Sequence, residues 1–248
     1  MSDLTLAERS RAVAKSLLAA GIFDVDGVLL DSPHERAWRE ALQGFADPNR
    51  FTTEIYMAHV AGKPRLSGAR AVLEAMGVPD PEPQASVYAE RKQKRLEELI
   101  QAKEFAAFPD ALRFVLALKA LGLPMAVASS SRNANPMMRM VRLESGQTLV
   151  EVFKVNVCGR SFRQGKPNPE IFLTAASELG LAPASCFVVE DAPAGIEAAR
   201  AGGMMALGVA RLNDADLLHA AGADLVVTSL DEVAVNELPS GRLCRQST

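Results

Sequence analysis

The stretch over residues 21–32 constrains the fold of this chain more than any other part of the sequence. It begins with a short apolar run, residues 21–23, which is typical of the end of a buried parallel strand. Asp24 and Asp26 follow at positions i and i+2, so both carboxylates project to one side of an extended backbone. Gly27 then lets the chain bend sharply away. The pattern predicts paired carboxylates at the carboxyl edge of a parallel sheet, where open α/β sheets bind ligands.

Two facing carboxylates need a cation, and Mg²⁺ is the natural partner of a cluster of hard oxygen atoms. One Asp is suited to attack a phosphoryl group while the other moves a proton, a division of labour that the environment sets. Asp-x-Asp-Gly also occurs in calcium loops and in ordinary turns, so a catalytic role for Asp24 and Asp26 depends on the rest of the chain.

Composition narrows the class of protein. The 248 residues suffice for one large domain or two smaller ones, and the net charge of −3 gives no indication of a nucleic-acid partner. Three cysteines, Cys158, Cys186 and Cys244, are too few and too scattered for a disulfide framework or a metal knuckle. No signal peptide and no apolar run of membrane-spanning length is visible. We expect a cytoplasmic monomer without a membrane partner.

The first hundred residues are predicted to be helical, except for the strand that ends at residue 23. An amphipathic helix is predicted over residues 4–20, and another over residues 32–45 with Ser32 as its N-cap and Pro33 in its first turn. Three more helices are predicted, separated by glycine and proline: 52–60, 65–76 and 83–102. A helical block placed directly after the Asp-x-Asp strand is how a lid domain would be built.

Short apolar strands and helices alternate in the remainder. Helices are predicted over residues 110–121, 136–143, 170–179 and 194–201, and strands over 124–128, 152–157, 186–189, 204–209 and 224–227. This alternation predicts a parallel sheet with helices on both faces. The tail after residue 238 is polar and is expected to be loose.

Polar residues follow four of the predicted strands or their loops. They are Asp24 with Asp26, Ser129, Lys166, and Glu190 with Asp191. Phosphoryl transfer requires these residue types as nucleophile, proton carrier, hydroxyl clamp, cation and metal ligands. Each has a structural alternative: a serine in a turn, a solvated loop lysine, or acidic residues that cap the next helix. Four such features in one order along the chain favour a site.

This ordered set resembles the haloacid dehalogenase superfamily of phosphotransferases, in the branch with a helical cap after the first motif. The motifs are Asp-x-Asp-Gly-x-x-x-Asp-Ser, the strand that ends in Ser129, Gly-Lys-Pro-x-Pro-Glu-Ile-Phe around Lys166, and Val-Glu-Asp-x-x-x-Gly-Ile. The resemblance implies an α/β, Rossmann-like core with a parallel sheet, formed by residues 1–32 and 104–248. It implies an inserted α-helical cap domain over residues 33–103.

The resemblance also implies roles for the residues that match the motifs. Asp24 is then the nucleophile that becomes an aspartyl-phosphate, and Asp26 is the general acid/base. Ser129 and Lys166 hold the transferring phosphate. Mg²⁺ is bound by Asp24, by the backbone carbonyl of Asp26 and by Asp191 with Glu190 beside it.

Within the superfamily, the cap is similar to that of β-phosphoglucomutases. The similar stretches are His34-x-x-Ala37-Trp38, Gly62-x-x-Arg65, the pair Arg91-Lys92, and Ser129-Ser130-Ser131-Arg132-Asn133 with Arg in place of Lys. The likeness implies that substrate is bound by His34, Gly62, Arg65, Lys92, Ser130, Ser131 and Asn133. In it, His34 couples cap closure to the acid/base, and Arg65 recognises a phosphate that is not transferred.

Structural alternatives and departures stand beside this likeness. The structural alternative for His34 is packing against Trp38, four residues on, and for Arg65 it is an exposed position in the first turn of a helix. Lys63-Pro64 stands where mutases more often carry a small hydroxyl residue, and residues 142–148 look like an insertion. These departures bear on mutase activity more than on phosphoryl transfer.

We therefore predict a Mg²⁺-dependent phosphatase or phosphotransferase that acts on a small phosphorylated metabolite, a sugar phosphate first of all. Net hydrolysis is the first interpretation, and interconversion of β-glucose 1-phosphate and glucose 6-phosphate is the alternative. Dehalogenation is disfavoured because Asp26 suits phosphoryl transfer. A non-catalytic regulator that binds a sugar phosphate would have no use for the nucleophile Asp24.

Overall fold

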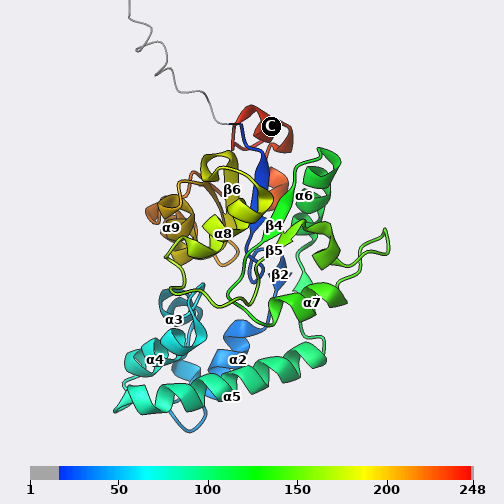
Figure 1. Ribbon diagram of the computed structural model, residues 1–248. Helices are drawn as coiled ribbons and strands as arrows, with labels where there is room; N and C mark the ends of the chain where they lie inside the picture. The colour runs from blue at the N-terminus through cyan, green and yellow to red at the C-terminus, as the bar shows by residue number, and fades with distance from the viewer. Residues whose placement is uncertain (1–16, 247–248) are drawn as a thin grey trace, which may run out of the picture.

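Six parallel strands form the sheet at the centre of the molecule (Figure 1). The computed structural model describes residues 17–246. The strands are β1 (Ala20–Phe23), β4 (Met125–Val127), β5 (Val155–Asn156), β6 (Cys186–Glu190), β7 (Met205–Val209) and β8 (Leu225–Val227). Their order across the sheet is β5-β4-β1-β6-β7-β8. The chain builds the sheet outward from β1 on one side and then returns to its other side, so the switch point of the topology lies at β1.

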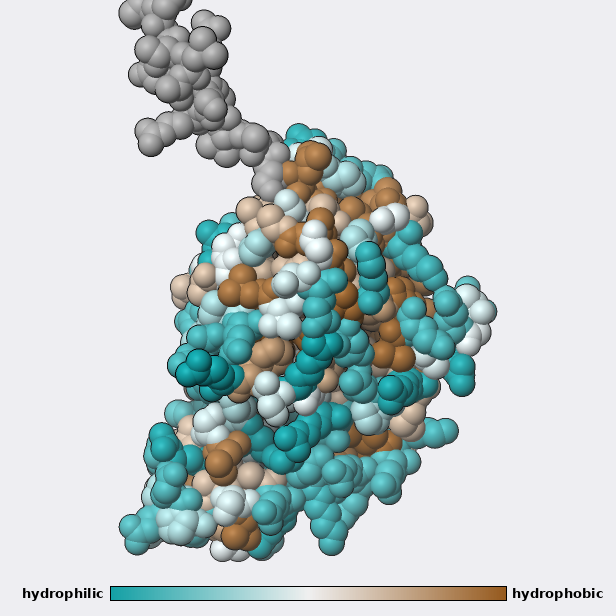
Figure 2. Space-filling model, in the orientation of Figure 1, coloured by the Kyte–Doolittle hydropathy of each residue, from teal (hydrophilic) through white to brown (hydrophobic). Residues whose placement is uncertain are grey.

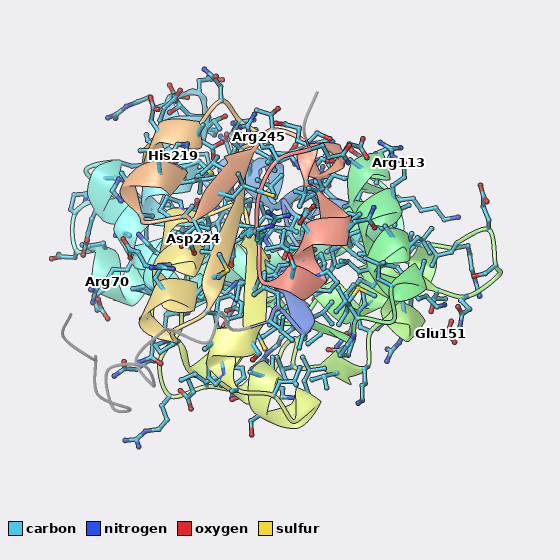
Figure 3. The ribbon with its side chains drawn as sticks, turned by 90° about the horizontal axis from the view of Figure 1, so that it is seen from above. Arg70, Arg113, Glu151, His219, Asp224 and Arg245 are labelled. Atoms are coloured by element: carbon cyan, nitrogen blue, oxygen red, sulfur yellow. The ribbon has the colours of Figure 1, made fainter. Side chains whose placement is uncertain are left out.

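Helices cover both faces of the sheet. On one face lie α6 (Pro109–Ala120) and α7 (Ala134–Met140), and on the other α8 (Glu170–Leu179), α9 (Pro193–Ala201) and α10 (Ala215–Ala220). Figure 3 shows Arg113 on α6 and His219 on α10 on opposite sides of the strands. Neighbouring strand residues alternate between the two apolar layers: Phe23 packs with the α6 side and Ile22 with the α8 side. Burial on both faces explains why the strands read as unbroken apolar runs.

A separate block of helices, called the helical cap from here on, lies below the sheet in Figure 1. It consists of α2 (His34–Ala41), α3 (Thr53–His59), α4 (Arg65–Ala75) and α5 (Pro81–Gln101), with a short 3₁₀ turn at Pro48–Arg50. Its buried apolar cluster is centred on Trp38 and Tyr88, whose rings meet edge to face at 5.2 Å. The Tyr88 hydroxyl donates to the backbone oxygen of Trp38 at 2.9 Å, so its polar atom is satisfied inside the cluster.

A two-stranded antiparallel pair joins the cap to the sheet-containing part. In it β2 (Leu30–Asp31) pairs with β3 (Ala106–Ala107), with Leu30 opposite Ala107 and Asp31 opposite Ala106. The chain enters and leaves the cap next to this pair. The cap boundaries at residues 33 and 103 stay a prediction. The pair at residues 30–31 and 106–107 lies just outside them, which is consistent with that prediction.

The surface carries no broad apolar face in the view of Figure 2. Hydrophilic residues cover much of the helical cap there, and hydrophobic residues form separate patches over the sheet-containing part. Among residues 17–246, no helix combines the length and the hydropathy that crossing a membrane requires.

The predicted fold class, a parallel α/β sheet with helices, is confirmed. Several local predictions were wrong. Pro33, without a side-chain bond, occupies the N-cap that was assigned to Ser32. The strand predicted over residues 152–157 is only Val155–Asn156, preceded by a 3₁₀ turn at Leu149–Val152.

The two ends of the chain also differ from expectation. The helix predicted over residues 4–20 lies mostly outside the described residues, and within them residues 17–19 are not helical. The tail that was expected to be loose is ordered through residue 246. A 3₁₀ helix covers Val235–Ser240, and Gln246 donates from its backbone nitrogen to the Glu232 oxygen at 2.8 Å.

Candidate active site

The site begins where β1 ends, between its two neighbouring strands. Asp24 donates its backbone N–H to the Val189 oxygen at 3.0 Å, which ties it to β6. At Gly27 the chain turns with φ +79°, and a Cβ added there would stand 1.8 Å from Asp191 Oδ2. A side chain is therefore excluded at Gly27 both by its backbone conformation and by Asp191. The turn after β1 and the end of β6 thus bring Asp24, Asp26 and Asp191 to one edge of the sheet.

Lys166 reaches into this edge from the loop before α8. Its Nζ donates to Asp24 Oδ1 at 2.6 Å and also to Glu190 Oε1, and its side chain is 1% exposed. The other oxygen of Glu190 accepts from the backbone nitrogens of Asp191 and Ala192, at 3.1 and 3.2 Å. Both Glu190 oxygens are therefore engaged in holding Lys166 and the turn after β6.

The buried charges shift one another's pKa values. Burial acts against the charged form of Lys166, but the carboxylates of Asp24 and Glu190 outweigh it and raise the pKa of Lys166. Burial raises the pKa of Asp24, and the Lys166 ammonium opposes this rise. Burial, together with the charges of Glu190 and Asp24, raises the pKa of Asp191 well above its usual range. Lys166 is therefore charged in this site, and Asp191 is the carboxylate whose charged form is most strongly disfavoured.

Asp26 faces the cap through His34. His34 Nε2 lies 3.4 Å from Asp26 Oδ1, and neither atom has a hydrogen-bond partner within the described part of the chain. On the other side of the ring, His34 Nδ1 lies 3.1 Å from Lys92 Nζ. Because an ammonium only donates, a charged Lys92 leaves the ring proton on Nε2, pointing at Asp26. Burial lowers the pKa of Lys92 to about 7 and also lowers that of His34.

Polar residues after β4 form a regular series. The backbone nitrogen of Ser131 donates to Ser129 Oγ at 3.1 Å, and that of Asn133 donates to Ser131 Oγ at 3.2 Å. The Gly159 nitrogen fixes the Ser129 carbonyl at 2.9 Å. These local turns place Ser129, Ser131 and Asn133 one after another along one wall of the site.

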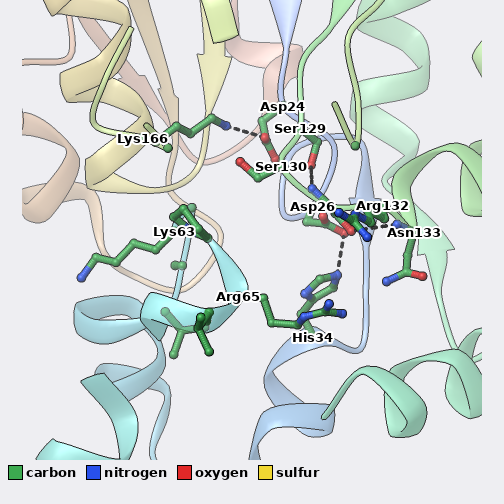
Figure 4. A pocket seen from close by; sticks show the side chains of 18 of the residues that line it. Asp24, Asp26, His34, Lys63, Arg65, Ser129, Ser130, Arg132, Asn133 and Lys166 are labelled. Carbon is green, nitrogen blue, oxygen red and sulfur yellow. Dashed lines mark hydrogen bonds and ion pairs between the residues drawn. The ribbon is translucent and has the colours of Figure 1, made fainter. Parts of the chain in front are cut away.

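A cavity of about 370 Å³ lies between the core and the cap (Figure 4). Every residue predicted for the site lines it except Glu190: Asp24, Asp26, His34, Gly62, Arg65, Lys92, Ser129, Ser130, Ser131, Asn133, Lys166 and Asp191. Further lining residues escaped the sequence reasoning, among them Tyr56, Gln93 and Arg160. The sequence signal that could have identified Gln93 is its position directly after Lys92 on α5, because Lys92 was predicted for the site.

The two ends of the cavity differ in charge. In Figure 4 Lys166 and Asp24 lie together at one end, Arg65 and Asn133 lie toward the other, and Asp26 lies between them. Lys63 turns away from the carboxylates and donates to the Ala58 oxygen at 2.7 Å. The guanidinium of Arg65 donates to Gln93 and has no carboxylate partner among residues 17–246. The second end is therefore suited to an anionic or hydroxyl-bearing group.

The cap loop that carries Arg65 touches the core directly. A Cβ on Gly165 would stand 2.3 Å from Pro64 Cγ, so the loop before α8 can pass here only without a side chain. A Cβ on Gly62 would meet Ala192 Cβ at 3.3 Å. Met57, Ala61 and Ala192 form a small apolar cluster across the same contact. These contacts close one side of the cavity.

The carboxylates suit a hard cation but do not form a complete cage. Among residues 17–246, no three His, Cys, Asp or Glu side chains are arranged to hold a metal ion by themselves. Mg²⁺ usually takes one or two carboxylates and completes its shell with water and substrate phosphate oxygens. Asp24 and Asp191, whose charges repel each other, are carboxylates of that kind. The donor set therefore fits Mg²⁺ with ligands supplied in part by substrate and water.

Comparisons with known proteins show which sequences and structures this chain is similar to. The family described as haloacid dehalogenase-like hydrolase matches residues 19–203. The chain is 31% identical to hexitol phosphatase A of Escherichia coli over 222 residues, which are 89% of this chain and 95% of that protein. It is 33% identical to a β-phosphoglucomutase of Mycobacterium bovis, covering 86% of this chain and 90% of the other.

A solved structure with the same fold is the β-phosphoglucomutase of Pyrococcus sp. strain ST 04. It matches with a TM-score of 0.70 and 31% identity, over 90% of this chain and 97% of that one. The relatives thus include one phosphatase and two phosphomutases by name, and their lengths correspond closely to that of this chain.

Proposed function

The chain belongs to the haloacid dehalogenase-like hydrolases, an enzyme family, and we propose that it hydrolyses phosphorylated sugars through an aspartyl-phosphate on Asp24. One observation carries this proposal most directly. Asp24, held by Lys166 at 2.6 Å, and Asp26, facing His34, open from the end of β1 into one cavity. A nucleophile and a proton carrier on one side of the same strand end are what phosphoryl transfer needs.

The residues allow a two-step reaction. An oxygen of Asp24 attacks the phosphorus atom, the bond from phosphorus to the sugar oxygen breaks, and Asp26 gives its proton to that oxygen. Asp26 then takes a proton from water, whose oxygen attacks phosphorus and breaks the bond to Asp24. Lys166 offsets the charge on the phosphoryl oxygens throughout, and Ser129 lies at the same end as a hydroxyl donor. Burial raises the pKa of Asp26, which favours its protonated form for the first step.

For the metal we propose Asp24, the backbone carbonyl of Asp26, and Asp191 as ligands. Glu190 is left out of this set because both of its oxygens already bind Lys166 and backbone nitrogens. Bound Mg²⁺ would supply positive charge for the transferring phosphoryl group and would offset the repulsion among the carboxylates.

A sugar phosphate is the substrate class that the rest of the cavity supports. Its walls offer hydroxyl and amide groups from Ser130, Ser131 and Asn133 and the cations Arg65 and Lys92. Such groups suit a polyhydroxylated molecule with one phosphate at Asp24. The named activities of the relatives, hexitol phosphatase and β-phosphoglucomutase, support the same class.

β-Phosphoglucomutase activity is the second candidate. It is favoured by Arg65, which stands at the end of the cavity away from Lys166, where a second phosphate on the sugar would lie. A mutase must hold the aspartyl-phosphate while the sugar reorients, whereas a phosphatase admits water.

The test is a phosphate-release assay with Mg²⁺ across sugar mono- and bisphosphates. A parallel reaction offers β-glucose 1-phosphate with a trace of the 1,6-bisphosphate and detects glucose 6-phosphate. Phosphate release without glucose 6-phosphate supports the phosphatase. Glucose 6-phosphate with little free phosphate supports the mutase and gives Arg65 a phosphate-binding role. Absence of both reactions would refute a sugar-phosphate substrate.

A further inference from the structure

We propose that Gln93 is a positioning residue that sets the substrate range, because it holds Arg65 of the cap and Asn133 of the core in place for the far end of the substrate. The inference rests on the proposed function in that it names how the same cavity recognises the part of the molecule that does not react. Gln93 itself lies on α5 and lines the cavity.

The side-chain amide of Gln93 uses all of its hydrogen-bonding capacity. Its oxygen accepts from Arg65 Nη1 at 2.5 Å and from Asn133 Nδ2 at 3.3 Å. Its nitrogen donates to Glu97 Oε1 at 2.7 Å and to Asn133 Oδ1 at 3.1 Å. An amide offers two donors and two acceptor positions, so all four are occupied.

The charged neighbours fix which way this amide points. Arg65 only donates, so it requires the oxygen of Gln93, and Glu97 only accepts when ionised, so it requires the nitrogen. A flipped amide would oppose both. With Gln93 fixed, the pairing with Asn133 is fixed as well, because its nitrogen must then meet the Gln93 oxygen. Glu97 thus determines, through Gln93, which way the side-chain amide of Asn133 is oriented.

The pairing spans the junction between the two parts of the protein. Gln93 and Arg65 belong to the cap, whereas Asn133 lies directly before α7 in the core. The local turn at Ser131 holds the backbone of Asn133 but leaves its amide group free to choose a partner. Gln93 therefore brings one cation and one amide from different parts of the chain into a single fixed arrangement.

A substrate group that accepts hydrogen bonds is the chemistry this arrangement fits. The guanidinium of Arg65 has further N–H groups beyond the one given to Gln93, and it presents them in a planar fork. A phosphate, or a pair of sugar hydroxyls, at the far end would be recognised. A small aryl phosphate reaches only Asp24 and Lys166 and gains nothing from Gln93.

The experiment compares the two kinds of molecule on one enzyme. Hydrolysis of p-nitrophenyl phosphate gives a KM for a probe without a far end, and inhibition of that reaction by glucose 1,6-bisphosphate gives a Ki for a probe with one. The variants are Gln93→Ala and Gln93→Glu. Gln101→Ala and Gln101→Glu are the matched controls, since Gln101 is exposed at the end of the same helix.

For Gln93→Ala we expect the Ki of the bisphosphate to rise about tenfold, the usual cost of losing one polar partner, with a much smaller change in the KM of the aryl phosphate. Gln93→Glu should raise the Ki further, because its carboxylate pairs with Arg65 and faces Glu97. A double-mutant cycle with Asn133→Ala should show non-additive losses. The Gln101 variants should keep the wild-type Ki.

Equal losses for both probes would assign Gln93 a purely structural role and overturn the proposal, as would a Ki that does not change. Failure of the bisphosphate to inhibit the wild-type enzyme would overturn it too. The proposed function fails separately, when no sugar phosphate is hydrolysed or isomerised, because the Ki is measured whether or not the bisphosphate is turned over.

Discussion

Two buried clusters of charge lie in the sheet-containing part, and they are built in opposite ways. In the first, Asp110 at the start of α6 accepts from Arg211 at 2.8 and 3.1 Å, from Ser229 Oγ at 3.1 Å and from the Leu230 nitrogen at 2.8 Å. Arg211 lies over the Phe108 ring at 4.0 Å. Burial alone would raise the pKa of Asp110, but Arg211 and these donors lower it. One anion faces one cation, and every Asp110 oxygen is satisfied.

In the second cluster, four carboxyl groups surround one ammonium. Lys166 holds Asp24 and Glu190, while the pKa values of Asp24, Asp26 and Asp191 are raised, chiefly by burial. The charges are unmatched where a phosphate and a cation are expected to bind. We infer from the contrast that matched charges serve stability and that unmatched charges mark the proposed site of the reaction, at a cost in stability.

The largest effect is expected at Asp24, the proposed nucleophile. Asp24→Asn removes the attacking carboxylate and should lower kcat by on the order of 10⁴-fold or more, since no other group forms the covalent intermediate. Phosphate release from p-nitrophenyl phosphate measures this. Asp216→Asn, at an exposed position of α10, is the control and should keep full activity. Substantial turnover in a folded Asp24→Asn protein would break the assignment of chemistry to the second cluster.

The matched cluster should respond in stability instead. Asp110→Ala leaves the partly buried Arg211 without its counter-ion, which costs about 3 kcal/mol of unfolding free energy. Urea unfolding followed by circular dichroism measures the loss. Asp231→Ala breaks the exposed pair with Arg113 and should cost much less. If both variants lose the same small amount of unfolding free energy, the pairing of Asp110 with Arg211 does not stabilise the fold.

A gain in stability is expected at the unmatched cluster. Because the pKa of Asp191 is raised by burial and by Glu190 and Asp24, its charge at neutral pH opposes folding. Asp191→Asn should therefore add about 0.5–2 kcal/mol in the presence of a chelator, although it impairs activity. Thermal unfolding with and without Mg²⁺ measures this, and Mg²⁺ should stabilise the wild type more than the variant. A lower Tm for the variant in chelator would contradict the charge repulsion.

The smallest expected effect is in acid. Since the folded-state pKa of Asp110 is lowered, its contribution is present above the unfolded pKa of about 3.9 and is lost as pH falls through the folded value. The difference in unfolding free energy between the wild type and Asp110→Asn should therefore shrink by on the order of 1 kcal/mol between pH 5 and pH 3. Urea unfolding at several pH values tests this. A difference that stays constant across that pH range would contradict an electrostatic contribution of Asp110 to stability.

Sequence reasoning reached the sheet and its edge because both depend on short-range patterns. Strands such as β1 and β6 are buried on both faces and so appear as apolar runs, and the residues that end them lie at one edge. Sequence reasoning assigned both Glu190 and Asp191 to the metal site, although neighbouring residues of an extended segment point to opposite sides. One carboxylate consequently meets Lys166, and the other faces the cavity.

Features that depend on distant parts of the chain escaped. The pair β2–β3 has two residues in each strand, too few for any periodicity, and forms only because residues 30–31 and 106–107 meet after the cap is built. The role of Gln93 depends on where α5 lies against the segment before α7, which no local pattern encodes. The order of the last residues arises from backbone bonds between residues 232–234 and 244–246.

The β2–β3 pair has a consequence for how such a chain can be diversified. It holds Asp31 opposite Ala106, so the two ends of the intervening segment stay at the spacing of paired strands. Closing a loop over such ends costs only about 0.6 kcal/mol more for each doubling of its length. A longer or shorter insert can therefore be exchanged at these two points as a cassette, while the carboxylates at the sheet edge keep their positions. Recombination at residues 31 and 106 would thus replace the cap residues that line the cavity, His34 among them, while Asp24, Asp26 and Lys166 stay at the sheet edge.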